Sequence, residues 1–333
     1  MLKNISSASF MADRQTDDLA IYVAWLSYIG GYTQAEIADR LSLSRAKVHR
    51  LIGEAHQAGY VHVYIDRSPQ RLVSYEDRIA EYFGLSQCLV VPDVEDPNDR
   101  HGNVGALGSA AARYVHGRIA SGEVSSLGVS WGRSLAEMTR QLPREGLPHL
   151  AIVSLMGSLT QQSAINPFDV VYRLAEKTGG QGFFLPVPFI ADSIEDRNVL
   201  MAQRSVADAL ARARAIDLGV VGIGAMALDQ PMFMEERGLL GARQLAELIE
   251  AGAVGELVGH FLDCNGRPIP MVINERTIGL SLAELAEREI VAVTGGADKG
   301  PAIHAVLNSG VVDRLILDEP AAKSLLNVRS RAA

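Results

Sequence analysis

The stretch from Leu127 to Met138, "LGVSWGRSLAEM", matches the pattern Gly-x-Ser-x-Gly at Gly128, Ser130 and Gly132. In serine hydrolases this pattern forms a sharp strand-to-helix turn that presents the serine as a nucleophile. Here too an apolar run precedes the motif and a helical pattern follows it. The same turn would also point backbone N–H groups at the start of a helix, where anions bind. The sequence therefore leaves two chemistries open at Ser130, which are acyl transfer and the binding of an anion.

A nucleophilic serine needs a histidine and an acid. Asp263 and His304 follow Ser130 in the chain order of the α/β-hydrolases. However, His304 lies in the helical pattern "PAIHAVL", whereas the histidine of such a triad usually lies on a loop, and no HGGG-type segment precedes the motif. We therefore expect no catalytic residue and no enzyme. A sugar-phosphate isomerase or deaminase that uses Asp263 and Lys299 is the alternative, ahead of a serine hydrolase.

Other glycine-rich and polar segments also follow apolar runs. Arg133 stands next to Gly132, and Lys299 follows Gly295-Gly296 just before a helix that begins at Pro301. Because a glycine turn that opens a helix beside a cation suits an anion, these two loops predict a clamp for one phosphate or carboxylate. Asp263 would accept from sugar hydroxyls. The expected effector-binding residues are Ser130, Trp131, Gly132, Arg133, Ser134, Gly157, Ser158, Asp263, Gly296 and Lys299.

Simpler interpretations of these residues stay open. The glycines can serve only as tight turns. Asp263 can stabilise the following Asn265-Gly266 turn through its side chain, and Lys299 can cover apolar surface with its stem. Neither cysteine, Cys88 or Cys264, has metal-ligand spacing, and we expect neither a cofactor nor a metal.

The elements that must position these loops alternate along the chain between apolar runs and helical patterns. Such alternation predicts an α/β fold with a largely parallel sheet covered on both faces, in which ligands bind at the carboxyl ends of the strands. The expected strands are 88–92, 125–130, 150–157, 182–188, 218–224, 256–263, 288–296 and 313–318. The expected helices include 103–121, 166–178, 203–215, 242–251 and 300–308.

The N-terminal segment has a different pattern. Residues 17–29 predict an apolar helix, Thr33 with Glu36 forms a capping box, and Ser44 caps a second helix that ends near Ala58. Two helices joined by a tight turn form a helix-turn-helix, and the alternating residues 60–65 predict a wing. A generic helical hairpin with a solvated basic face is the alternative.

The second of these helices has two distinct faces at 100° per residue. Val48, Leu51, Ile52 and Ala55 gather on one face, whereas small and basic side chains project from the other, as in a recognition helix in the major groove. The expected DNA-contacting residues are Thr33, Gln34, Ser44, Arg45, Ala46, Lys47, His49 and Arg50.

Charge is unevenly distributed over the 333 residues. Residues 1–68 hold seven basic and seven acidic side chains, so the net charge of −8 comes from the rest of the chain. No run reaches the roughly 18 apolar residues of a membrane span, and the N-terminus shows no apolar core of a signal peptide. We expect a cytoplasmic protein with a DNA-binding domain over 1–66, a linker and oligomerisation helix over 67–86, and an effector domain over 87–333. The apolar stripe Leu72, Tyr75, Ile79 and Phe83 would form either core or a dimer seam.

The chain resembles the SorC family of bacterial sugar-responsive transcriptional regulators from about Thr16 to Leu326. The resemblance rests on "YTQAEIADRLSLSRAKVHRLI", "LGVSWGRSL", "LPVPFIADS", "VGIGAM", "FLDCNGRPI" and "VAVTGGADKGPAIHAVLNSGVVDRLILDEPAA". It implies a winged-helix-like head on an effector domain whose fold looks like ribose-5-phosphate isomerase, glucosamine-6-phosphate deaminase and the CoA transferases. The family's ligand loops fall on Ser130 to Ser134, Asp263 and Lys299. Trp131 and Arg133 in the first loop match the sorbitol-regulator branch, whereas some relatives have small glycines and threonines there.

The expected function is that of a transcriptional regulator of a carbohydrate or polyol catabolism operon. Its implied partners are double-stranded operator DNA, a phosphorylated sugar or polyol, and further copies of itself in a homodimer or homotetramer. RNA polymerase is a further candidate partner, and no membrane is expected.

Overall fold

The computed structural model of the chain describes residues 17–61, 63, 69–94, 103–158, 167–226 and 240–332. The contacts divide the chain into two compact units, Met1–Val63 and Tyr64–Ala333. The wing predicted at 60–65 and the linker predicted to begin at residue 67 include residues outside the described ranges, so both stay predictions.

The first unit is helical. Residues 17–29 form a helix whose last five residues, Trp25–Ile29, have π-helical geometry. Helix α2 spans Gln34–Leu41 and helix α3 spans Arg45–Gln57. Both predicted caps are present, since the Thr33 hydroxyl accepts from the Glu36 amide and the Ser44 hydroxyl accepts from the Lys47 amide. The three helices share one apolar core, which includes Val23, Ile37, Val48, Leu51 and Ala55.

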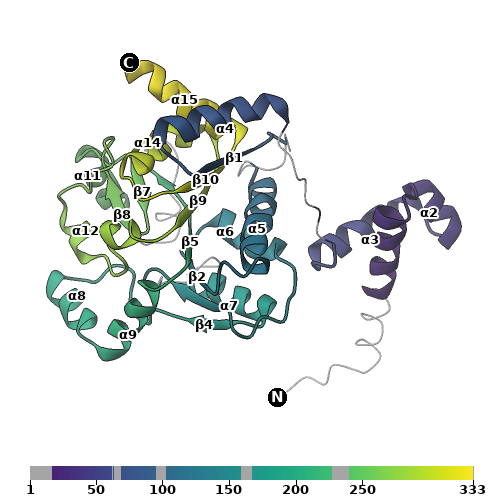
Figure 1. Cartoon of the computed structure of the whole chain (residues 1–333), viewed down its shortest axis with the longest axis horizontal. Coiled ribbons are helices and arrows are strands. Elements are labelled where there is room, and N and C mark those ends of the chain that lie inside the picture. The colour runs from purple at the N-terminus through teal and green to yellow at the C-terminus, as the bar shows by residue number, and fades with distance from the viewer. Residues whose placement is uncertain are drawn as a thin grey trace. The chain divides into compact units, whose positions relative to one another are not determined.

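The second unit is built on a seven-stranded sheet in which every neighbouring pair is parallel. The prediction of a largely parallel α/β sheet is therefore confirmed. In order across the sheet, the strands are β1 (Gln87–Val91), β10 (Arg314–Asp318), β9 (Ile290–Thr294), β5 (Leu218–Val221), β2 (Ser126–Val129), β3 (Ala151–Ser154) and β4 (Gln181–Phe183) (Figure 1).

Successive residues of a strand point to opposite sides of the sheet, so this sheet has two apolar faces. Helices cover both of them. On β9, Val291 and Val293 pack on one side and Ile290 and Ala292 on the other. The first side is covered by α5 (Val104–Ala120), α6 (Arg133–Gln141) and α7 (Pro167–Thr178). The second side carries α4 (Gln70–Phe83), α9 (Arg204–Ala213), α11 (Ala242–Glu250), α14 (Gly300–Asn308) and α15 (Glu319–Ala332). The remaining short helices are α8 (Ile194–Met201), α12 (Val272–Arg276), α13 (Leu282–Leu285) and the 3-10 turn η2 (Ala297–Lys299).

The apolar stripe of α4 is core. Leu72 and Ile79 are completely buried, and Tyr75 and Phe83 pack against the same apolar cluster of the second unit. This packing occupies the stripe within the chain itself, so the stripe is not an open dimer seam.

One predicted strand is wrong. Residues 256–263 do not form a single strand of the parallel sheet; they belong to an antiparallel hairpin of β7 (Gly255–Leu257) and β8 (His260–Leu262). Val258 and Gly259 form its two-residue turn, both with positive φ, as two-residue hairpin turns require. A valine rarely adopts that conformation, so the residue types there do not predict a turn. With β6 (Gly224–Ala225), the hairpin makes a separate three-stranded sheet.

Among the described residues, no helix is long and apolar enough to cross a membrane.

Candidate functional site

The helix α3 presents its basic side chains to solvent. Arg45, Lys47, His49 and Arg50 are exposed, as are Thr33, Gln34, Ser44 and Ala46 of the predicted set. The opposite face is buried as predicted, with Val48, Leu51 and Ala55 inaccessible and Ile52 partly buried. Arg50 pairs with Glu54 one turn later, at 3.2 Å between Nε and Oε1. The cap at Ser44 leaves Arg45 and Lys47 in the first helical turn, where a helix binds phosphate most readily.

Ser130 lies at the carboxyl end of β2, but its hydroxyl serves the protein's own backbone. The side chain is 2% exposed, and Oγ accepts from the Gly222 amide at 3.2 Å. Gly222 follows the neighbouring strand β5, so this hydrogen bond joins two loops at the same edge of the sheet. As a result, Ser130 fixes where the loop after β5 lies.

The three residues of a possible hydrolase triad have separate partners. The Asp263 carboxylate accepts from the amides of Asn265 and Arg267, both at 2.9 Å, and so forms the turn that follows β8. His304 is a helical residue whose Nδ1 lies 3.1 Å from the side-chain nitrogen Nδ2 of Asn308. Its ring is edge-on to that of Phe83. No described contact links either residue to Ser130, so the geometry of acyl transfer is not assembled.

Asp263 also lies on a different sheet from the one expected. It follows β8 of the small antiparallel sheet, and the neighbouring Gly266 packs against the last turn of α14, at Ala305 and Ser309. Lys299 precedes the first turn of the same helix. The prediction that both residues lie at one edge of a parallel sheet is therefore wrong, because the hairpin separates them to opposite ends of α14.

The loop after β2 and the loop after β9 both contact the loop after β5, the first through Ser130 and the second through Lys299. Lys299 donates from Nζ to the Ile223 carbonyl at 2.9 Å and lies 3.5 Å from the Thr294 hydroxyl. Burial of its ammonium group lowers the pKa of Lys299, and the positive charge of Arg133 lowers it further. The two predicted cations are therefore close enough to repel each other, which an anion between them would relieve.

Each of the two loops opens a helix, α6 after Gly132 and α14 after Lys299, and neither of these N-cap residues makes a side-chain capping hydrogen bond. Gly132 (φ 137°) precedes α6 without a side-chain cap, and Arg133 is the first helical residue and is exposed. The free N–H groups of a first helical turn and the helix dipole both favour a negative charge. Ser134 follows in the same turn and is partly buried.

The loop at Gly296 (φ 115°) is hydrogen-bonded to Asp318 at the carboxyl end of β10. Both oxygens of this fully buried carboxylate accept from the Gly296 amide at 3.1 Å, and Oδ1 also accepts from the Ala321 amide at 2.9 Å. A Cβ on Gly295 would lie 2.5 Å from Asp318, which explains the glycine there. The backbone beneath Lys299 is thus rigidly positioned.

Gly157 and Ser158 are structural in the described contacts. Gly157 donates to the Ile278 carbonyl, and a Cβ there would lie 2.5 Å from the Pro188 carbonyl oxygen. Ser158 pairs through its backbone with the segment 187–189. The segment 159–162 that follows lies outside the described residues. Trp131 of the loop after β2 is 6% exposed, and its ring lies 5.6 Å from that of Phe189. Its side chain therefore packs into the apolar core.

Sequence reasoning missed Glu256. This residue of β7 is 5% exposed, its Oε1 accepts from the Gly259 amide at 2.5 Å, and its charge interacts with that of Lys299. Burial raises the pKa of Glu256 to about 7, despite the hydrogen bond and the nearby lysine. The only signal in the sequence was a single glutamate inside the apolar run "VGELVGHFL".

A family model described as "Putative sugar-binding domain" matches residues 67–327 of the chain. Among curated proteins, the chain is 39% identical over 316 residues to the erythritol catabolism regulatory protein EryD of Brucella abortus, covering 95% of this chain and 98% of that protein. It is 30% identical over 320 residues to the transcriptional regulator LsrR of Klebsiella pneumoniae, covering 94% of each.

Solved structures agree with this assignment. A DeoR family transcriptional regulator from Listeria monocytogenes superposes with a TM-score of 0.70 at 26% identity, covering 77% of this chain and all of that one. The full-length sorbitol operon regulator SorC from Klebsiella pneumoniae superposes with a TM-score of 0.68 at 21% identity, covering 94% of this chain and 99% of that one, and so shares the fold. These relatives are regulators and not enzymes. The chain belongs to the SorC family of sugar-responsive transcriptional regulators.

Proposed function

We propose that this regulator binds operator DNA through α3, as the recognition helix of a helix-turn-helix, and binds a phosphorylated sugar or polyol at the carboxyl ends of β2, β5 and β9. The observation that carries the effector half is that the loops after β2 and β9 both hydrogen-bond to the loop after β5, through Ser130 and Lys299, with Arg133 at the start of α6. The relative EryD is named for erythritol catabolism, so a short polyol or its phosphate is the first ligand to test.

The residues have distinct roles in this proposal. The amides at the start of α6 and the guanidinium of Arg133 bind the phosphate oxygens, because charge-assisted hydrogen bonds are stronger than neutral ones. Lys299 provides a second positive charge from the opposite loop. Glu256, which is buried and whose charge interacts with that of Lys299, is a further candidate to bind a ligand hydroxyl.

The DNA half rests on the exposed basic face of α3 and on the Ser44 cap that fixes its first turn. Arg50 and Lys47 bind phosphates or base edges, and Arg45 lies at the end of the helix that enters the groove. A helix-turn-helix monomer covers one half-site, so we propose a homodimer or homotetramer acting on DNA in the cytoplasm. We further propose that the effector unit has the fold of ribose-5-phosphate isomerase and its relatives.

The two activities are linked by a coupling free energy. If the ligand prefers one arrangement of the oligomer, ligand binding changes the DNA affinity by the same factor by which DNA binding changes the ligand affinity. The coupling free energy is typically ~1–3 kcal/mol. The fluorescence anisotropy of labelled upstream DNA, titrated with protein at two salt concentrations, tests the DNA half. Repeating it with erythritol, erythritol phosphate, sorbitol phosphate and inorganic phosphate tests the effector half. Absence of salt-sensitive DNA binding would refute the first half, and a DNA affinity unchanged by every phosphate ester would refute the second.

A further inference from the structure

A hollow lies at the amino ends of the parallel strands, whereas the effector loops lie at their carboxyl ends. It has a volume of about 360 Å³ and lies between α5 and the first residues of β1, β9 and β10. The effector loops follow the carboxyl ends of the strands, whereas Gln87 and Arg314 are the first residues of β1 and β10. The two sites therefore share the strand β9 but no residues.

The floor of this hollow follows from strand register. Gln87 pairs with Arg314, and Arg314 pairs with Val291, so these three lie in one row across the strands. Leu89 and Ile316 form the next row, two residues further along. Because side chains two apart on a strand share a face, all five point toward α5. The floor is therefore aliphatic, with a cation and an amide in its outer row.

The roof of the hollow consists of two turns of α5. Arg113 with Gly117, and Tyr114 with Arg118, are pairs spaced four residues apart and lie on one helical face. Gly117 leaves the space open, since a Cβ there would meet no atom within 4 Å. A hollow of this size is far larger than the voids that remain in packed interiors, and it falls within the range of small-molecule pockets.

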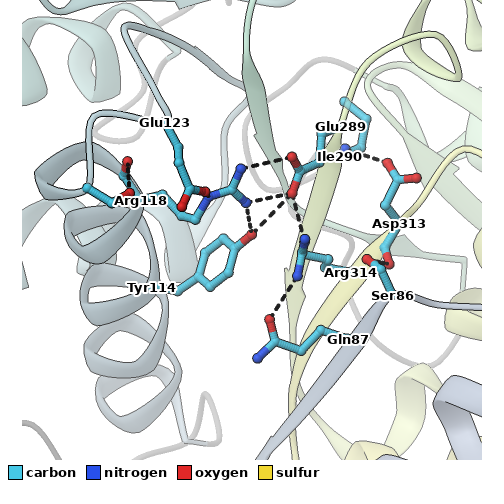
Figure 2. Close-up of polar contacts among 10 residues, drawn as sticks. Ser86, Gln87, Tyr114, Arg118, Glu123, Glu289, Ile290, Asp313 and Arg314 are labelled. Carbon is cyan, nitrogen blue, oxygen red and sulfur yellow. Dashed lines mark hydrogen bonds and ion pairs between the residues drawn. The ribbon is translucent and has the colours of Figure 1, made fainter.

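Figure 2 shows a network of charges beside the hollow. Glu289 accepts from both terminal nitrogens of Arg118, at 2.6 and 2.9 Å, and from Nε of Arg314 at 2.7 Å. Arg118 also donates to the Tyr114 hydroxyl at 2.7 Å and pairs with Glu123 at 2.6 Å. These contacts hold Tyr114 and Arg314 in fixed positions.

Arg314 is the cation that stands at the floor of the hollow, where its Nε pairs with Glu289 at 2.7 Å. Within the described part of the chain, Arg314 uses Nε for Glu289 and one terminal nitrogen for Gln87. Its other terminal nitrogen is left to donate a charge-assisted hydrogen bond to a ligand carboxylate. An apolar wall with an arginine at its rim selects a small molecule with an apolar body and one anionic end.

We propose that this hollow is a second ligand site, separate from the effector loops, that takes a small aromatic or medium-chain carboxylic acid. The apolar body lies on Leu89, Val291 and Ile316 beneath Tyr114, and the carboxylate pairs with Arg314 at the rim. This site extends the proposed function, because it would let a metabolite of a different chemical class bind the same regulator.

The test uses the full-length protein, with benzoate and octanoate as probes and benzyl alcohol and octanol as their uncharged counterparts. Ligand-observed NMR and calorimetric titration measure the binding. We expect the acids to bind at least tenfold more tightly than the alcohols. Gly117→Leu fills the hollow and should abolish binding of all four probes. Arg314→Gln should weaken the acids at least tenfold and leave the alcohols unchanged.

Gly105→Leu is the matched control. Gly105 belongs to the same helix, also has open space around it, and does not line the hollow. Both substitutions remove a helical glycine, so circular dichroism should show a folded protein with an unchanged or raised Tm. Binding that survives Gly117→Leu, or that is lost in Gly105→Leu, would overturn the proposal. So would binding that disappears in Lys299→Met, because the probes would then occupy the effector loops. No binding by any probe would also overturn it, without bearing on the sugar-phosphate site.

Discussion

Ser130 and Lys299 bind the backbone of neighbouring residues of one loop. The Ser130 hydroxyl accepts from the Gly222 amide at 3.2 Å, and the Lys299 ammonium donates to the Ile223 carbonyl at 2.9 Å. The loop after β5 is thus held between the loop after β2 and the loop after β9, three neighbours in the sheet. A ligand that draws Lys299 toward an anion would release Ile223, so effector binding and the conformation of this loop are coupled.

Replacement of Lys299 by Met should remove the effector response and preserve DNA binding. The side chain keeps its apolar stem but loses the charge opposite Arg133. We expect no change in DNA affinity on adding a phosphorylated polyol, whereas Lys323→Met, on α15, should respond like the wild type. Fluorescence anisotropy with and without ligand measures both. A normal response in Lys299→Met would exclude this loop from the effector site.

Ser130→Ala should weaken the effector response only moderately. The substitution removes one neutral hydrogen bond to the Gly222 amide, typically worth about 1 kcal/mol, or roughly fivefold in affinity. Thermal-shift titration with the active phosphate ester compares the two proteins. A complete loss of DNA binding, or measurable ester hydrolysis by the wild type that this variant lacks, would contradict a purely structural role for the Ser130 hydroxyl.

Arg50→Ala and Lys47→Ala should each weaken DNA binding. Each phosphate contact that is lost reduces the slope of log affinity against log salt by about 1. Salt titrations of anisotropy with the upstream DNA measure this slope. Arg204→Ala is the control, because Arg204 is an exposed cation of the second unit whose side chain is 96% accessible. Equal effects from all three substitutions would argue against α3 as the recognition helix.

Glu256→Gln should stabilise the protein above neutral pH. The folded state raises the pKa of Glu256 from 4.5 to about 7, so the wild type loses stability as pH rises through this window. This difference in pKa corresponds to about 3 kcal/mol at most, and glutamine can keep the hydrogen bond from Gly259. Urea denaturation at pH 5 and pH 8 should show a gain for the variant at pH 8 that shrinks toward pH 5. An equal effect at both values would show that Glu256 is ionised throughout.

Glu289→Gln should destabilise the protein at neutral pH. The guanidinium of Arg118, followed by that of Arg314, lowers the pKa of Glu289 from 4.5 to about 2. The stability from this carboxylate is fully present above pH 4.5 and is lost as pH falls toward 2. We expect a loss of about 2–3 kcal/mol at pH 7 that is smaller at pH 3. Glu123→Gln is the control: its side chain is 58% exposed, so its loss should cost less than about 1 kcal/mol.

The sequence predicted local structure well where a single side chain or period decides it. The caps at Thr33 and Ser44, the buried face of α3 and the helix over 300–308 follow from short-range rules and are present. The alternation of apolar runs with helical patterns also predicted the parallel sheet. One further rule, that the carboxyl ends of parallel strands share an edge, placed the loops after β2, β5 and β9 at one edge, where Ser130 and Lys299 both contact the loop after β5.

The predictions that were wrong, and the features that the sequence did not predict, depended on contacts between residues far apart in the chain. The run 256–263 has the composition of a strand, and only its pairing with β6 and the turn at Val258 made it a hairpin, which moved Asp263 to the far end of α14. Glu256 became notable because folding buries it near Lys299. The hollow under Gly117 exists only because α5 lies over the register of β1, β9 and β10. By itself the sequence determined which segments form helices and strands and where the cations stand along the chain, because those depend on near neighbours. Burial, pKa and the space left for a ligand were decided by the tertiary structure alone, since each depends on atoms that the chain brings together from far apart.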